Sequence, residues 1–338
     1  MKSLGTKANY AGSSHKIAYL DGWRGIAVIF VLYSHFLVIG NTNWLGSLGV
    51  DFFFALSGYL MAEVLFIKRQ SLDKFFIRRA SRIIPVFTIY IVIAVLVYRY
   101  FSTRTYVVPL DEIFSTLLFF RSYSPSIPSI WETPWAIGHL WSLNIEEHSY
   151  LWLALCALIS RKHSNKFVMF LLICSLALTF VFRIVHQIGF LPSPSDFTLY
   201  SHVAAYGIFF SVLCRLVTEW GSSLSLSKNV NAYISLGCLC LAFLVSTPTV
   251  GKPVLAPFFL AVSLAKFSTV PQSIKYFFSN PILCWFGRVS FSLYVWQQIF
   301  YMNFENKIIG LFCSLAVAAC SYYIIERPVR KFINRHYG

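Results

Sequence analysis

The residues of this sequence best suited to chemistry are a histidine and two glutamates inside long apolar segments. His35 belongs to the apolar run 25–39, and Glu146 and Glu147 lie in the segment 137–160. Ionisable side chains are costly in such segments, so each is a candidate functional residue. A histidine facing a carboxylate could act as a general base, with the carboxylate fixing the imidazole tautomer. The alternative is a structural His–Glu hydrogen bond that joins two helices, and the sequence favours neither interpretation.

Helical spacing relates these groups to Arg24. Arg24 and His35 are eleven residues apart, about three helical turns, so they lie on nearly one helix face. His35 then lies roughly 16 Å beyond Arg24, and Glu146 lies roughly 14 Å along a helix that starts near residue 137. In an apolar layer of about 30 Å, His35 and Glu146 therefore both lie near the middle.

Three arginines, Arg78, Arg79 and Arg82, form a second group at the start of the apolar run 83–98. Arg79 and Arg82 are spaced i, i+3 and share a helix face. Two guanidinium groups held in place suit phosphate or pyrophosphate recognition. An isolated pattern of this kind is more typical of basic residues at the cytoplasmic end of a span, next to lipid head groups.

The segment GVDFFFALSGY contributes Asp51 and Ser57 as candidate substrate-contacting residues. Its flanking glycines indicate close helix approach or an interrupted helix. Ser57 lacks the GxSxG context of a serine nucleophile. The eight cysteines all stand in apolar stretches, and no HExxH motif or other metal-ligand pattern occurs, so no metal site is predicted.

The composition requires membrane-spanning helices to position these residues. Of the 338 residues, 57% are hydrophobic and 12% are charged, against roughly 25% charged residues in a soluble domain. Because lipid offers no partners to backbone polar groups, apolar runs of about 20 residues predict transmembrane helices. The predicted fold is all-α, a polytopic helical bundle of about ten spans, with a loop over 102–136. The spans are 22–40, 46–67, 83–101, 137–160, 167–183, 200–217, 232–246, 253–270, 281–303 and 308–325.

The Lys and Arg residues that give the net charge of +15 are distributed unevenly between the two predicted sides of the membrane. With a cytoplasmic N-terminus, 21 of the 28 Lys and Arg residues fall on the cytoplasmic side and six on the other side. Both termini are therefore predicted to be cytoplasmic. No row of Lys and Arg residues lies on a polar segment that could fold into a binding surface, so nucleic-acid binding is not expected. We expect one membrane domain over 1–338, with a polar N-terminus (1–18) and a basic tail (326–338).

Six motifs in order resemble the acyltransferase-3 family of membrane proteins, which O-acylate polysaccharides, glycolipids and some antibiotics. The Arg24-x10-His35 spacing is similar to the hallmark of that family, and Glu146 stands at the glutamate of its Trp-Ser-Leu-x-x-Glu motif, which here begins at Trp141. The motifs are LDGWRGIAVIFVLYSHF (20–36), GVDFFFALSGYLM (49–61), IRRASRIIPVF (77–87), GHLWSLNIEEHSYLW (138–152), GRVSFSLYVWQQ (287–298) and IIERPVRKF (324–332).

The resemblance implies acyl transfer without a permanently bound cofactor, from cytoplasmic acyl-CoA (acetyl-CoA in most relatives) to a hydroxyl of a carbohydrate or lipid-linked glycan. The acceptor would be of the cell-surface polysaccharide, lipopolysaccharide O-antigen or exopolysaccharide type, at the inner (cytoplasmic) membrane. It implies that Arg24, Arg78, Arg79 and Arg82 meet the CoA phosphates. His35 would be the general base and Glu146 or Glu147 would orient it or bind the acceptor, with Asp51, Ser57 and Trp141 at the substrate.

The sequence departs from the resemblance at two positions. Many relatives have histidine at Gln297, so that residue is expected to contribute packing or a polar contact and not proton transfer; Ser149 stands where an aromatic residue is common. No sign of the soluble esterase-like domain fused to some relatives is seen before Gly338. The alternative function is a transporter or flippase for a lipid-linked sugar, although the internal repeats typical of transporters are not found. The sequence does not indicate an oligomeric state.

Overall fold

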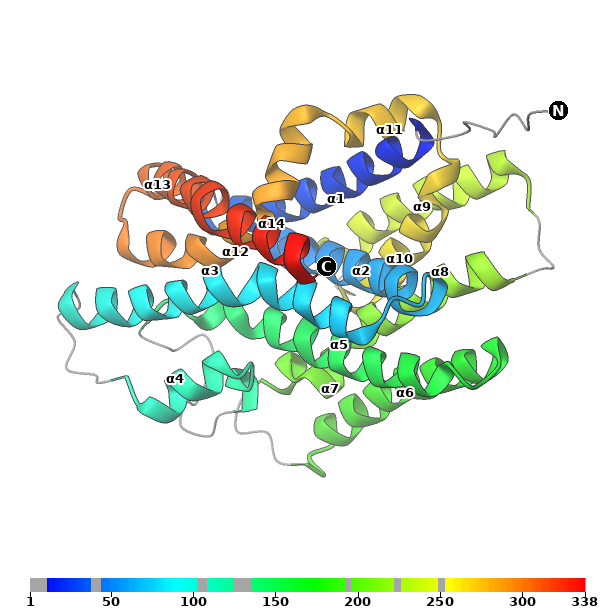
Figure 1. Ribbon diagram of the computed structural model, residues 1–338, viewed down its shortest axis with the longest axis horizontal. Helices are drawn as coiled ribbons and strands as arrows, with labels where there is room; N and C mark the ends of the chain where they lie inside the picture. Colours follow the sequence, from blue (N-terminus) through cyan, green and yellow to red (C-terminus); the bar gives the residue numbers. More distant parts are fainter. Residues whose placement is uncertain are drawn as a thin grey trace.

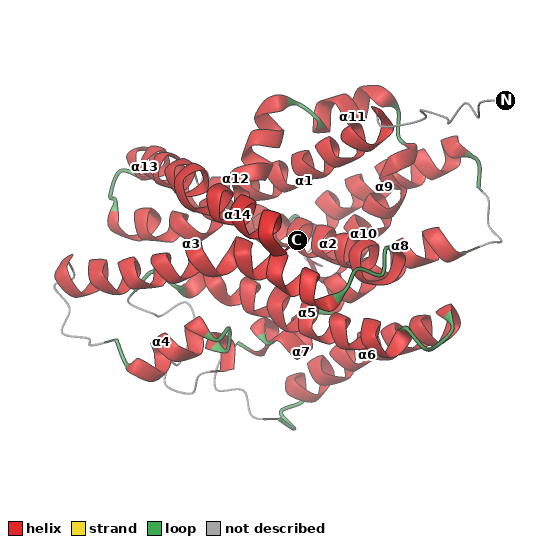
Figure 2. Ribbon diagram, in the orientation of Figure 1, coloured by secondary structure: helices red, strands yellow, loops and turns green. Residues whose placement is uncertain are grey.

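The computed structural model describes residues 11–37, 44–101, 108–123, 135–191, 196–221, 226–248 and 253–337, so the first ten residues of the polar N-terminus lie outside it. Within these ranges the chain is helical and has no β-strand (Figure 2). The prediction of an all-α fold is therefore confirmed.

The longest helices correspond to predicted spans, and shorter ones connect them (Figure 1). The α-helices are α1 (Ala11–Phe36), α2 (Trp44–Met61), α3 (Leu72–Phe101), α4 (Leu110–Leu117), α5 (Trp141–Ser160), α6 (Asn165–Gln187), α7 (Ser201–Ala204), α8 (Tyr206–Trp220), α9 (Lys228–Ser246), α10 (Ala256–Lys266), α11 (Gln272–Phe278), α12 (Pro281–Asn303), α13 (Lys307–Ser321) and α14 (Arg327–Tyr337). Two π-helical turns, η1 (Ala62–Ile67) and η8 (Tyr322–Glu326), extend α2 and α13. The 3-10 turns are η2 (Arg121–Tyr123), η4 (Gly138–Leu140), η5 (Phe197–Leu199), η6 (Pro253–Leu255) and η7 (Phe267–Thr269).

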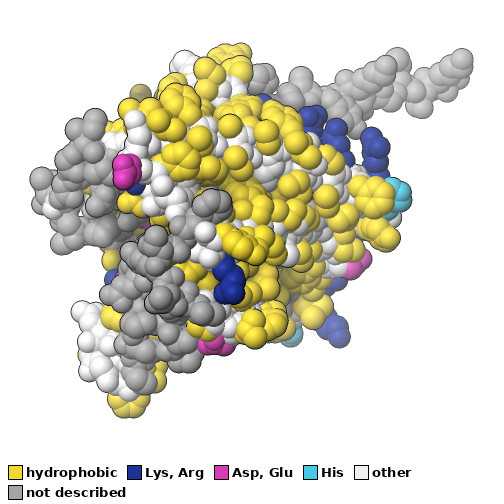
Figure 3. All heavy atoms as spheres, turned by 90° about the vertical axis from the view of Figure 1, so that its left-hand side faces the viewer, with side chains coloured by type: hydrophobic (Ala, Val, Ile, Leu, Met, Phe, Trp, Pro, Cys, Tyr) yellow, Lys and Arg dark blue, Asp and Glu magenta, His cyan; other side chains and the backbone are white. Residues whose placement is uncertain are grey.

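Six helical segments of the described chain are long and apolar enough to cross a membrane: Trp44–Ile67, Leu72–Tyr100, Asn165–Gln187, Ser201–Trp220, Lys228–Ser246 and Lys307–Tyr337. Large apolar side chains such as Ile84, Leu178 and Phe312 are exposed on their outer surfaces. Hydrophobic side chains also dominate the face of the molecule in Figure 3, where few charged side chains are visible. An apolar surface of this extent is stable in contact with lipid and unfavourable in contact with water, so the chain is a multi-pass membrane protein.

Helices also occupy the other predicted spans, but α1, α5 and α12 do not reach the same combination of length and hydropathy, and Ala256–Thr269 is shorter. The physical reason is that α1, α5 and α12 carry buried polar residues. The number of ten spans stays a prediction. Three helices were not predicted: α4 within the expected loop, α11, and α14 in the basic tail.

Close packing between α1 and α12 fixes the centre of the molecule. A side chain at Gly25 of α1 would overlap the backbone oxygen of Leu283, and one at Gly287 of α12 would overlap the backbone oxygen of Asp21. Only glycine permits this approach of two helix backbones. α2 lies against the other side of α1, and α3, α5 and α6 follow below these helices in Figure 1.

Candidate active site

A cavity of about 270 Å³ lies where α1, α2, α3, α5 and α12 meet, and we call it the arginine cavity. Arg24 of α1 and both Arg79 and Arg82 of α3 line it, which confirms that the i, i+3 spacing places the last two on one face. Arg78 is exposed and is not among the residues that line the cavity. α3 begins at Leu72 and not near residue 83, so these arginines project from a continuous helix.

Arg79 is held by carboxylates from α5. Its Nε donates to Glu147 Oε1 at 2.8 Å, and its Nη2 lies 2.6 Å from Glu147 Oε1 and 3.2 Å from Glu146 Oε2. The guanidinium also lies over the ring of Tyr150, 3.6 Å from its centroid. Its charge is thus balanced within the protein, and Arg79 ties α3 to α5.

Glu146 completes this network on the wall of the arginine cavity. Ser57 Oγ donates to its Oε1 at 2.9 Å, and Tyr150 Oη donates to its Oε2 at 3.1 Å. The structure therefore brings Ser57, Arg79, Glu146 and Glu147 together. It does not bring either glutamate to His35: Glu146 lines the arginine cavity, Glu147 is bound to Arg79, and neither lines the cavity that contains His35.

Arg24 and Arg82 are less completely paired than Arg79. Arg24 Nη1 donates to Asp21 at 3.0 Å, and Arg82 Nε lies 3.9 Å from Glu326 Oε1 at the end of the π-helical turn η8. Arg330 lies 3.8 Å from the same oxygen, and Glu326 is fully buried, with Ser292 Oγ donating to its other oxygen. Arg82 and Arg330 thus share one carboxylate, which leaves net positive charge beside the cavity.

A second cavity, of about 510 Å³, lies between α1, α2, η4, the start of α5 and α12, and we call it the histidine cavity. His35 lines it, with Nδ1 3.2 Å from Oε1 of Gln297 and the ring stacked on Tyr301. Because an amide oxygen only accepts, Nδ1 carries the hydrogen and Nε2 keeps the lone pair of a base. The predicted polar contact of Gln297 is therefore confirmed.

His139 lines the same cavity and was missed by the sequence analysis. Its Nε2 lies 3.1 Å from the backbone oxygen of Val295, so Nε2 carries the hydrogen. Nδ1 therefore has a lone pair, and it is buried without a hydrogen-bond partner in the described part of the chain. The signal that could have identified this residue is the one used for His35: an ionisable side chain inside a predicted span.

Tyr294 of α12 lines both cavities. Its hydroxyl donates to the backbone oxygen of His139 and lies 2.7 Å from Ser142 Oγ. Tyr294 therefore lies at the boundary between the space beside the arginines and the space beside the histidines.

The remaining candidates are Trp141 and Asp51. Trp141 lines the histidine cavity, and its contact with a substrate stays a prediction. Asp51 lines neither cavity and lies instead in a separate hollow of about 230 Å³ beside Trp44. No group of three or more potential metal ligands was found within the described ranges.

Comparison with known proteins adds to this geometry. The family described as acyltransferase domain matches residues 17–325. The chain is 27% identical to the peptidoglycan O-acetyltransferase OatA of Listeria monocytogenes serovar 1/2a, over 94% of this chain and 57% of that protein. It is 26% identical to "Putative peptidoglycan O-acetyltransferase YrhL" of Bacillus subtilis strain 168, over 92% of this chain and 54% of that protein.

The chain thus spans a little over half the length of these relatives. No solved structure matches it significantly. The family match includes Arg24, His35, Arg79, Arg82 and Glu146, and it ends one residue before Glu326. This chain belongs to the acyltransferase-3 family of membrane acyltransferases.

Proposed function

We propose that this chain is a membrane O-acyltransferase that moves an acetyl group from acyl-CoA to a hydroxyl of a cell-surface glycan. The observation that carries the proposal is the meeting of a cationic cavity and an imidazole-lined cavity at Tyr294. A polyanionic thioester donor suits the first cavity, and a hydroxyl that must lose a proton suits the second. The names of the relatives support a glycan acceptor, with peptidoglycan as the first candidate.

The donor would lie on the side of the arginine cavity. Arg24 and Arg82 would meet the CoA phosphates together with Arg330, because Arg82 and Arg330 share the single carboxylate of Glu326 while Arg24 pairs with Asp21, which leaves one positive charge in excess. Arg79 has a different role in this account. It is neutralised by Glu146 and Glu147 and holds the wall along which the pantetheine arm would pass.

The reaction would occur at the boundary near Tyr294. His35 Nε2 takes the proton of the acceptor hydroxyl while Nδ1–H is held by Gln297. The hydroxyl oxygen attacks the thioester carbonyl carbon, a C–O bond forms, and the C–S bond breaks. The CoA thiolate leaves and takes the proton from the imidazolium, so that the products are the O-acetyl ester and free CoA.

The distribution of basic residues supports an orientation in the inner (cytoplasmic) membrane with both termini cytoplasmic. In that orientation Arg82, near the start of α3, lies toward the cytoplasm and His35, near the end of α1, lies toward the opposite side. A cytoplasmic donor and an extracytoplasmic acceptor would then meet inside one helical bundle.

The test uses the purified chain in lipid nanodiscs with acetyl-CoA and a lipid-linked or polymeric cell-wall glycan. The proposal expects one free CoA for each acetyl ester formed on the glycan. A flippase would instead move a lipid-linked glycan across a liposome membrane without releasing CoA, and that result would overturn the proposal.

A further inference from the structure

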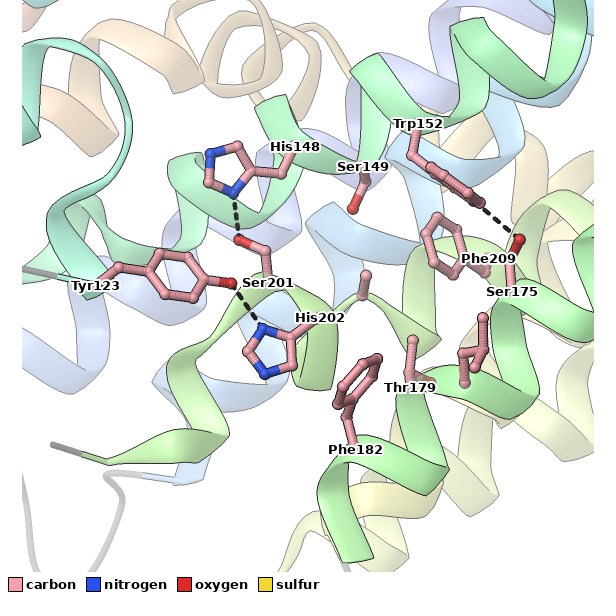
Figure 4. A pocket seen from close by; sticks show the side chains of 12 residues that line it. Tyr123, His148, Ser149, Trp152, Ser175, Thr179, Phe182, Ser201, His202 and Phe209 are labelled. Atoms are coloured by element: carbon pink, nitrogen blue, oxygen red, sulfur yellow. Dashed lines mark hydrogen bonds between the residues drawn. The ribbon is translucent and has the colours of Figure 1, made fainter. Parts of the chain in front are cut away.

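A third cavity lies on the other side of α5 from the arginine cavity. It has a volume of about 320 Å³ and is lined by residues of α5, α6, α7 and α8, by Ala205 and by Tyr123 of η2 (Figure 4). Glu146 and Tyr150 of α5 face the arginine cavity, whereas His148 and Ser149 line this one. We call it the α5–α6 pocket, and nothing in the proposed reaction uses it.

The pocket contains a hydroxyl group that has no hydrogen-bond partner in the described part of the structure. Ser149 is 2% exposed, and its Oγ, which has no such partner, points into the pocket in Figure 4. His148 Nδ1 lies 2.8 Å from Ser201 Oγ, whereas its other ring nitrogen points away from the pocket in Figure 4. Buried polar groups are normally satisfied, so Ser149 Oγ indicates a ligand that can donate and accept hydrogen bonds.

The remainder of the lining restricts the chemistry of that ligand. Trp152, Phe182 and Phe209 present aromatic surfaces, and the Trp152 ring is fixed by a 2.9 Å hydrogen bond from Nε1 to Ser175 Oγ. None of the twelve lining residues is Asp, Glu, Lys or Arg. A phosphate or carboxylate would find no fixed counter-charge there, and an alkyl chain would leave Ser149 Oγ unsatisfied. An uncharged sugar ring offers both hydroxyl groups and an apolar face.

A shallow apolar hollow of about 390 Å³ adjoins the pocket. The two share Tyr123, His148 and Trp152, and the hollow continues over Leu151 and Leu155, both exposed on the apolar surface of α5. A ligand with a sugar in the pocket and hydrocarbon in the hollow would satisfy both surfaces.

We propose that the α5–α6 pocket binds a glycosyl group of a lipid-anchored glycan, with the lipid chain in the adjoining hollow. This inference rests on the proposed function and specifies how the acceptor is held. Trp141 of the histidine cavity and His148 are seven residues apart on α5, roughly 10 Å along the helix. A glycan anchored at His148 can therefore direct a neighbouring sugar toward the histidines.

The binding test uses the nanodisc-embedded protein and hexyl β-D-glucopyranoside, followed by saturation-transfer NMR. Ser149→Ala removes the hydroxyl that has no partner in the described structure. It should weaken binding of the glucoside about threefold to tenfold, the effect of one hydrogen bond. Ser149→Phe places a ring in the cavity and should abolish binding. Thr88→Phe, on the exposed surface of α3, adds the same ring elsewhere and should bind the glucoside like the unmodified protein. The assignment would be overturned if hexanol bound as tightly as the glucoside, or if Ser149→Phe bound the glucoside as tightly as the unmodified protein.

A second measurement separates this inference from the proposed function. In Ser149→Phe the affinity for acetyl-CoA should be unchanged, while the KM for a lipid-linked glycan acceptor should rise at least about tenfold. If the unmodified protein binds the glucoside but forms no ester, the proposed function fails and the pocket assignment stands. If ester forms with the same acceptor KM in both proteins, the pocket assignment is wrong.

Discussion

Two imidazoles in the histidine cavity have hydrogen positions that their partners determine. Gln297 Oε1 accepts a hydrogen bond from Nδ1–H of His35, and the backbone oxygen of Val295 accepts one from Nε2–H of His139. Each ring therefore keeps one nitrogen with a lone pair, Nε2 of His35 and Nδ1 of His139. In the proposed reaction, His35 would transfer the proton and His139 would hydrogen-bond to the acceptor hydroxyl.

Replacing His139 with glutamine tests the second assignment. The glutamine amide can still donate to Val295, so the fold should be retained, but the Nδ1 lone pair is lost. Turnover over KM for the glycan acceptor should fall about tenfold, the effect of one hydrogen bond to substrate, and acetyl-CoA affinity should stay constant. Steady-state kinetics with each substrate varied would measure both values. Unchanged acceptor kinetics would make His139 a packing residue.

Substitutions of Arg79 and Arg82 should have different effects although the two residues share a helix face: the first should lower stability and the second should weaken acetyl-CoA binding. Arg79→Ala leaves two mostly buried carboxylates without their partner and should cost about 3 kcal/mol of stability, seen as a lower Tm and yield. Arg82→Lys keeps the charge but loses the planar fork, so the protein should stay folded and bind acetyl-CoA more weakly. If Arg79→Ala is instead stable but no longer binds CoA, Arg79 is a donor-binding residue and not a structural one.

The sequence predicted which residues line the site better than which residues contact each other. Helical rise placed His35 and Glu146 at a similar depth, but depth is only one coordinate. The direction of each side chain about its helix axis depends on tertiary packing, and it turns Glu146 toward Ser57 and Arg79. For the same reason, the partners of Glu326 could not be read from its position near the chain end.

At the scale of helices, the contact of α1 with α12 controls the site because it sets His35 against Gln297. Gly287→Val would push the backbone at Asp21 away and should lower stability by about 1–3 kcal/mol or more. Gly237→Ala on α9 is the matched control, because in the described chain no atom beyond its sequence neighbours and its own helix backbone lies within 4 Å of the added Cβ. It should be neutral or stabilising by up to about 1 kcal/mol. Thermal unfolding in detergent would compare them, and equal Tm values would contradict this packing argument.

Hydropathy predicted the long lipid-facing helices well, since their exposed surfaces must be apolar. It could not predict α11 or α14, which are short and polar enough to resemble loops. The first turns of α3 were also assigned to a loop, because Asp73, Lys74 and Arg78 interrupt the apolar run. Short helices at a membrane surface are stabilised by packing and by contacts that a hydropathy pattern does not contain.

For the whole molecule, the arrangement of donor and acceptor depends on topology. Reporter fusions after Gly338 and within segment 121–136 should report opposite sides of the membrane, the first cytoplasmic. The reason is that 21 of 28 Lys and Arg residues gather on one predicted side. Signals from the same side for both fusions would contradict ten spans with cytoplasmic ends.

In the proposed reaction His35 removes the proton of the hydroxyl that attacks acyl-CoA, and acetyl transfer by His35→Gln measures this role. Glutamine keeps a polar side chain of similar reach but cannot accept the proton as imidazole does. Turnover is measured as acetyl ester formed per folded, membrane-inserted protein, with acetyl-CoA affinity determined on the same sample. The account predicts a fall of roughly 10²- to 10⁴-fold with unchanged affinity for the donor. Transfer by His35→Gln at a rate near that of the unmodified protein would contradict it.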